Sequence, residues 1–103
     1  MADAEHVVLA VSELGTNLVY HAGRGFMVLE EVTRQSGRRG VRVESRDAGP
    51  GISDVEAAMR DGYSTRGGYG NGLPAVRRLM DDLDIRTGAA GTTIVAYKWA
   101  AAS

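Results

Sequence analysis

Clusters of glycine divide this chain into short segments and constrain its fold more than any other feature of the sequence. Glycine makes up 14 of the 103 residues and gathers in clusters rather than at a fixed period, which argues against a collagen-like or repeat architecture. Clusters over residues 47–51, 67–72 and 88–91 separate apolar stretches with helical or strand spacing. We therefore expect one small domain whose chemistry lies near these clusters.

Length and composition exclude several classes of protein. A chain of 103 residues, 44% hydrophobic and 24% charged, makes a single globular domain over residues 1–103. Its net charge of −1 supplies no field that would hold a nucleic acid. With no cysteine and two histidines, disulfides, thiolate catalysis and a histidine-based zinc site are excluded. The longest aliphatic stretch, residues 7–11, is too short to cross a membrane, and we expect a cytoplasmic protein.

The first half of the chain is predicted to form a helix and two antiparallel strands. Aliphatic residues at intervals of four, three and four indicate an amphipathic helix that ends near residues 22–23. The apolar run 26–32 is typical of a strand, and a turn over 36–40 leads to the alternating strand 41–46. The helical stripe consists of Val7, Val11, Leu14 and Leu18.

The second half is predicted to contain a short helix, a long loop, a second amphipathic helix and a hairpin. The short helix covers residues 55–59 with Ser53 as its cap, and the loop covers residues 62–72, which include five glycines. The second helix has Pro74 in its first turn, where the missing amide costs least. The hairpin joins strands 84–87 and 92–99. The stripe of the second helix consists of Leu73, Val76, Met80 and Leu83.

The glycine-rich segment 67–72 runs directly into the second helix. Its amides converge where a helix has unpaired N–H groups, which favours an anion such as phosphate. The signal is weak by itself, because a connector ahead of an ordinary helix has the same composition. Gly70, Gly72 and Ala75 also fit a dinucleotide pattern, but no strand precedes them. Lys98 is the only lysine in the chain, so a Walker motif is absent.

Glu13 and Asn17 lie four residues apart on one flank of the first helix. A carboxylate at this place can orient or deprotonate a nucleophile. An amide oxygen suits Mg²⁺, which is held mainly by phosphate oxygens. The alternative for both residues is a solvated polar edge of the helix. His21, one turn further on, is interpreted as a cap or a packed imidazole.

Asp47 follows the alternating strand and begins a glycine turn. Its carboxylate can accept hydrogen bonds from the amino group of a ligand, while glycine lets the ligand approach the backbone. The alternative is an aspartate that makes an Asx turn. Thr92 and Thr93 are equally explained as good strand residues. The arginines at 77–78 are explained as a solvated helix face.

The order of these segments resembles the GHKL (Bergerat-fold) ATPase and kinase superfamily. Residues 13–17 resemble its N box, 47–52 its first glycine box, 70–73 its second and 91–93 its third. The segments 60–65 and 72–81 are similar to the RsbT type of serine/threonine switch kinase of the bacterial stressosome, which is related to anti-sigma factor kinases. The resemblance implies an α/β (α+β) two-layer sandwich: a mixed, mostly antiparallel sheet with helices on one face.

The resemblance also implies a role for each matching residue. Glu13 would be the general base, and Asn17 the Mg²⁺ ligand. Asp47 would bind the adenine amino group, helped through water by Thr92 or Thr93, of which we favour Thr92. Residues 53–69 would form a lid over ATP, where Arg66 is our own hypothesis for charge compensation at the γ-phosphate. The remaining nucleotide contacts would come from Gly49, Gly51, Ile52, Gly70, Gly72 and Leu73.

The function implied by the resemblance is an ATP- and Mg²⁺-dependent protein serine/threonine kinase. It would phosphorylate a STAS-domain protein and act as a partner switch that also binds another regulator, such as a PP2C-type phosphatase. Three alternatives remain open: an anti-sigma factor kinase that binds a sigma factor, a histidine kinase catalytic domain, and a nucleotide-binding module without turnover.

The first helix begins almost at Met1, whereas family members carry a strand and a helix before it. We expect this difference to expose a sheet edge and part of a helix face. The chain is therefore expected to be a fragment or shortened product, to form a homodimer, or to need a partner.

Overall fold

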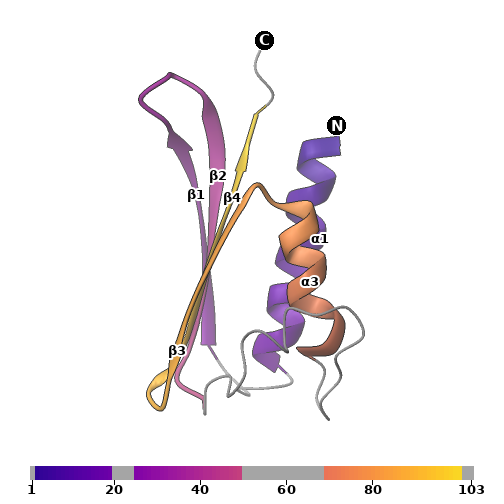
Figure 1. The fold of residues 1–103 in the computed structure, drawn as a ribbon, viewed down its shortest axis with the longest axis vertical. Coiled ribbons are helices and arrows are strands. Elements are labelled where there is room, and N and C mark those ends of the chain that lie inside the picture. Colours follow the sequence, from indigo (N-terminus) through magenta and orange to yellow (C-terminus); the bar gives the residue numbers. More distant parts are fainter. Residues whose placement is uncertain (1, 20–24, 50–68, 101–103) are drawn as a thin grey trace.

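A computed structural model describes residues 2–19, 25–49 and 69–100 (Figure 1). The other residues, 1, 20–24, 50–68 and 101–103, include the expected short helix and nearly all of the expected lid. In chain order the elements are α1 (Ala2–Asn17), β1 (Gly25–Thr33), β2 (Arg39–Asp47), α3 (Tyr69–Leu79), β3 (Asp82–Gly88) and β4 (Gly91–Trp99).

The four described strands form one sheet in the order β1-β2-β4-β3. All three strand pairings are antiparallel, and α1 and α3 pack side by side on one face of the sheet (Figure 1). This two-layer arrangement confirms the predicted fold class. None of the helices that the structure describes is long and apolar enough to span a membrane.

The core lies between the two helices and the inner face of the sheet. Alternation along each strand directs every second side chain toward the helices, so that the strands contribute small and branched residues to the layer that the helices cover. Leu14, Leu73, Val43 and Val76 are the largest side chains with no exposure. Packed with them in the same cluster are Ala10, Met80, Ile94 and Ala96.

The first hairpin has the predicted strands but a shifted turn. Its backbone closes where Gly37 N donates to the Arg34 carbonyl and Arg34 N donates to the Arg38 carbonyl, at 2.8 and 2.9 Å. Gly37 has a φ of 88°, a conformation that favours glycine. Arg39 and Gly40, expected in the turn, already belong to β2.

The second helix differs from the prediction at both ends. It begins at Tyr69, so Pro74 lies inside it rather than in its first turn. It ends at Leu79, and Leu83 belongs to β3 instead of the helical stripe. The helix stops because Asp81 N donates to the carbonyl of Tyr97 on β4 and Lys98 Nζ donates to the carbonyl of Leu79, at 2.8 and 2.9 Å. These contacts begin the pairing of β3 with β4 before Leu83, the last residue of the helical apolar spacing.

The predicted end of the first helix is not tested by the described residues. The α-helical part of α1 runs to Asn17, and Leu18 and Val19 continue it as one π-helical step. Residues 20–24, which contain His21, lie outside the described part of the chain.

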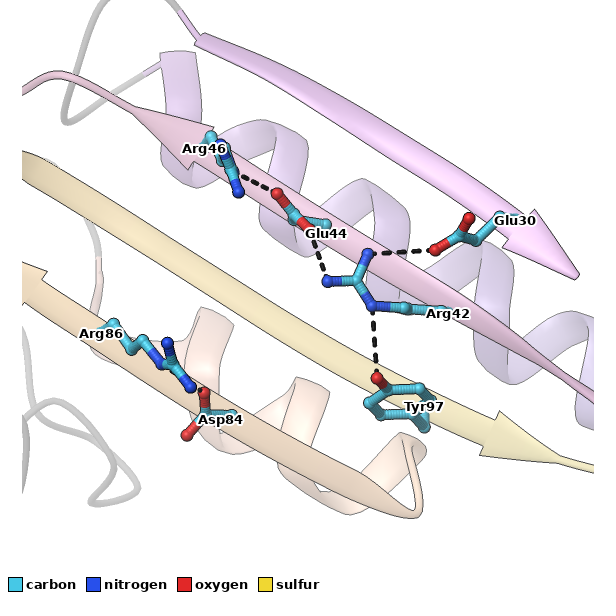
Figure 2. Close-up of polar contacts among 7 residues, drawn as sticks. All are labelled: Glu30, Arg42, Glu44, Arg46, Asp84, Arg86 and Tyr97. Atoms are coloured by element: carbon cyan, nitrogen blue, oxygen red, sulfur yellow. Dashed lines mark hydrogen bonds and ion pairs between the residues drawn. The ribbon is translucent and has the colours of Figure 1, made fainter. Parts of the chain in front are cut away.

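The outer face of the sheet carries a ladder of charged side chains (Figure 2). Glu44 is only 7% exposed there and lies between two arginines, with ion pairs to Arg42 and Arg46. Arg42 also binds Glu30 Oε1 at 3.2 Å and donates from Nε to the Tyr97 hydroxyl at 3.3 Å. The hydrogen bond from Arg42 lowers the pKa of the Glu44 carboxyl, although desolvation acts in the opposite direction. The ladder therefore holds this carboxylate ionised.

An apolar edge borders the sheet at β1, the outermost strand on that side of the described sheet. The side chains of Phe26, Val28 and Leu29 on β1 are exposed, as are those of Val8 and Leu9 on α1. The expectation that missing N-terminal elements expose this edge stays a prediction. Whether a second copy or another protein covers it stays a prediction.

Candidate functional site

One end of the two-layer sandwich gathers the elements that carry the expected site (Figure 1). The end of α1, the end of β2, the start of α3 and the β3–β4 turn all lie at this end. These elements bring Asn17, Asp47 and Thr92 from three distant parts of the chain to the same end of the molecule.

Asp47 and Thr92 are paired directly across β2 and β4. Strand alternation places both on the inner face, because Asp47 lies four residues after Val43 and Thr92 two residues before Ile94. Thr92 is buried, at 3% exposure. Its hydroxyl lies 2.9 Å from the hydroxyl of Thr87, the residue opposite it on β3. A carboxylate and two hydroxyls therefore form one polar row at the end of the inner face.

The Asp47 carboxylate makes the local turn that was considered as an alternative. Gly49 N donates to Asp47 Oδ1 at 2.9 Å. This contact uses one of the two carboxylate oxygens, and it fixes the direction of the group. The Asx contact and a role in ligand binding are thus compatible.

Gly91 explains why the third glycine box needs glycine at its first position. It has a φ of 136°, and a Cβ at this residue would collide with the carbonyl oxygen of Asp47 and lie 2.9 Å from the Cα of Ala48. The turn thus packs tightly on the backbone that carries the aspartate.

Asn17 is 5% exposed, and its Nδ2 has no hydrogen-bond partner among the residues that the structure describes. The alternative of a solvated edge is therefore wrong for Asn17. Glu13, one turn earlier on α1, is half-buried. A buried donor without a partner costs free energy, and Nδ2 would suit an acceptor such as a phosphate oxygen.

The start of α3 supplies backbone amides to the same end of the molecule. In a helix that begins at Tyr69, the first four N–H groups have no intrahelical acceptor. Gly70 and Gly72 belong to the first described turn of α3, and their binding of an anion stays a prediction. Leu73 is the fifth residue, so its amide falls within the helical hydrogen-bonding pattern, and its side chain is fully buried in the core.

Thr93 is placed on the other face of the sheet from Thr92. It lines a cleft of about 540 Å³ together with Phe26 and Arg46, and Asp47 and Ala48 at the end of β2 also border this cleft. By strand alternation and register, Thr92 is the threonine whose side chain lies on the same face of the sheet as that of Asp47. Gly51, Ile52 and Arg66 lie outside the described residues.

The side chains in this end of the molecule suit a magnesium nucleotide. Asp47 can only accept hydrogen bonds when ionised, which matches an amino group, and the amide oxygen of Asn17 is a hard donor that matches Mg²⁺. Within the described ranges, no cluster of three or more acidic or histidine side chains could hold a metal by itself. A metal held at Asn17 would therefore take most of its ligands from phosphates and water.

Sequence reasoning missed Thr87. The residue looks like an ordinary strand threonine, and only the strand register places it opposite Thr92. A signal was nevertheless present: Thr87 precedes Gly88, and the hairpin 88–91 was predicted, so counting back from its turn would have paired the two threonines.

Comparison with known protein families agrees with this geometry. The model of the "Histidine kinase-like ATPase domain" family matches residues 1–98. The chain therefore belongs to this family, as its four motif segments suggested.

Among individual proteins, the chain is similar to "Serine/threonine-protein kinase RsbT" of Bacillus subtilis (strain 168). The two are 43% identical over 98 residues, which cover 94% of this chain and 73% of the relative. This similarity agrees with the RsbT-type resemblance that residues 60–65 and 72–81 suggested.

A solved structure shares the fold: "Histidine kinase domain from Erythrobacter litoralis EL346 blue-light activated histidine kinase". It has a TM-score of 0.64 and 24% sequence identity, with 94% of this chain and 44% of that chain covered. The chain thus spans less than half the length of this neighbour, and at this identity the likeness concerns the fold alone.

Proposed function

We propose that this protein is a cytoplasmic, ATP- and Mg²⁺-dependent protein serine/threonine kinase that phosphorylates a STAS-domain regulator and acts as a partner switch in bacterial stress signalling. The observation that carries the proposal is the pairing of Asp47 with buried Thr92 at the end that also holds Asn17. The similarity to the RsbT kinase supports the type of phosphoacceptor.

Adenine is recognised at the polar row of the inner face. The Asp47 carboxylate accepts from the exocyclic amino group, and its turn with Gly49 orients it. The Thr92 hydroxyl assists through a water molecule. Guanine is disfavoured, because its carbonyl at the equivalent position would face a carboxylate.

The triphosphate lies between α1 and the start of α3. The amides of Gly70 and Gly72 bind phosphate oxygens at the positive end of the helix. Leu73 anchors this helix in the core, so that the amide positions are fixed. Gly51, Ile52 and Arg66 complete the nucleotide contacts in the proposal.

Asn17 holds Mg²⁺ through its amide oxygen. The ion, when bound, neutralises phosphate charge in the loose transition state of phosphoryl transfer. Glu13, one turn away, accepts the proton of the acceptor hydroxyl and orients that oxygen toward the γ-phosphorus. In this proposal Asn17 acts on the charge of the phosphates through the metal, and Glu13 acts on the attacking hydroxyl.

The proposal is tested by incubating the chain with labelled ATP, Mg²⁺ and candidate STAS-domain proteins. We expect acid-stable label on the acceptor, and a loss of about a hundredfold or more in Glu13→Gln. The matched control is Glu5→Gln, an exposed acid on the same helix, which should transfer normally. Acid-labile label would indicate histidine phosphorylation and contradict the proposal, as would full activity of Glu13→Gln.

A further inference from the structure

Three successive rows of side chains cross the inner face of β3, β4 and β2. The first row is Leu83, Ala96 and Val43, the second is Ile85, Ile94 and Ser45, and the third is Thr87, Thr92 and Asp47. The rows change from apolar to polar toward the end where the nucleotide site lies. Thr87 is therefore part of this polar row, and no role in the proposed reaction has so far been given to it.

The contact between the two threonines restricts what the Thr92 hydroxyl can do. The oxygens are 2.9 Å apart, and a hydroxyl has one proton and two lone pairs. The two hydroxyls have two protons between them, and one of these protons lies between the two oxygens. The other hydrogen bonds that the Thr92 hydroxyl can make therefore point away from β3. Across the sheet in that direction lies Asp47, the partner of Thr92 in the β2–β4 register.

We propose that Thr87 is a positioning residue for adenine recognition: its hydroxyl holds that of Thr92 in the orientation used by the base and its water. This inference rests on the proposed function, since it assigns a further residue to the same nucleotide site. Thr92 is too buried for bulk water to replace the lost partner. Without the Thr87 hydroxyl, the hydroxyl of Thr92 adopts other orientations. Nucleotide binding must then order the Thr92 hydroxyl, which costs affinity.

The test is calorimetric titration of the full chain with ADP and Mg²⁺. Thr87→Val removes the hydroxyl at nearly constant volume and should weaken ADP binding about tenfold. Thr87→Ser keeps the hydroxyl and should bind within about twofold of the wild type. The matched control is Thr33→Val, the same change in an exposed residue at the far end of β1. Melting curves without nucleotide identify folded variants, and Thr87→Ala replaces Thr87→Val if the latter is unfolded.

A double-variant cycle with Thr92→Val separates positioning from packing. If Thr87 acts through Thr92, the double variant should bind ADP no more weakly than Thr92→Val alone. The inference is overturned if Thr87→Val binds like the wild type, if Thr87→Ser loses as much as Thr87→Val, or if the two losses add. Failure of the wild type to bind ADP would overturn the proposed function and this inference with it.

Discussion

Gly91 packs against the carbonyl oxygen of Asp47, so closely that no side chain fits between the β3–β4 turn and the end of β2. This contact joins the third glycine segment to the aspartate of the first. It is the structural reason why two motifs that are over 40 residues apart lie at one place.

Gly91→Ala should therefore weaken both the fold and the site. The substitution places a methyl group against the Asp47 backbone and strains a φ of 136°, at a cost of about 1–3 kcal/mol. We expect a lower melting temperature and weaker ADP binding, measured by calorimetry. Gly88→Ala is the matched control, because a Cβ at Gly88 meets nothing within 4 Å. Equal behaviour of the two variants would show that the contact is unimportant.

Asn17→Leu should raise the stability of the nucleotide-free chain while it removes magnesium dependence. The buried Nδ2 of Asn17 has no partner within the described part of the chain, and replacing such a group with an apolar one of similar shape is neutral or stabilising, by about 1 kcal/mol. ATP affinity should become the same with Mg²⁺ as with a chelator. A variant that melts earlier, or that keeps its response to Mg²⁺, would contradict the assignment.

Glu44 should make the fold sensitive to acid. Its pKa is lowered in the folded state by Arg42, from an ordinary value of 4.5, so the stabilisation is complete above that pH and is lost as the pH falls through the folded-state pKa. Thermal melts from pH 7 to pH 3 should show a smaller loss of stability for Glu44→Gln than for the wild type. Glu31→Gln, an exposed acid on β1, serves as the control and should follow the wild-type curve.

Lys98 should stabilise the junction between α3 and β3. Its Nζ donates to the Leu79 carbonyl at 2.9 Å and lies 3.8 Å from Asp81 Oδ1, with the lysine side chain only 13% exposed. Lys98→Met should lower the free energy of unfolding by about 1 kcal/mol in denaturant titrations. Arg86→Met, which breaks an exposed pair with Asp84, should cost less than about 0.5 kcal/mol. The reverse order of the two losses would be inconsistent with a helix-terminal role for Lys98.

Much of the fold was predictable, because strand alternation is a local pattern. The alternation over residues 41–46 identified β2, and the glycines at 88 and 91 identified the second hairpin. Leu83 was wrongly assigned to a helix, since Leu73, Val76, Met80 and Leu83 also fit helical spacing. What decides against the helix is a long-range contact, the hydrogen bond from Asp81 N to Tyr97, which no local pattern contains.

Motif order was enough to suggest candidate site residues, but it could not show which of them lie opposite each other in the sheet. Motif order identified Asp47 and Thr92, whereas the strand register was needed to put Thr93 on the opposite face and to add Thr87. The burial of Glu44 was also not visible, because an alternating strand predicts a solvated outer face. Its arginine neighbours, one on β2 to either side, cover it.

The central claim is that adenine binds at the Asp47–Thr92 row, and calorimetric titration with ATP and Mg²⁺ tests it most directly. We expect saturable binding to the wild type and a loss of about tenfold or more for Asp47→Asn, because the substituted amide presents a donor to the amino group of adenine. A folded wild-type chain that releases no heat with ATP, or an Asp47→Asn variant that binds equally well, would contradict it.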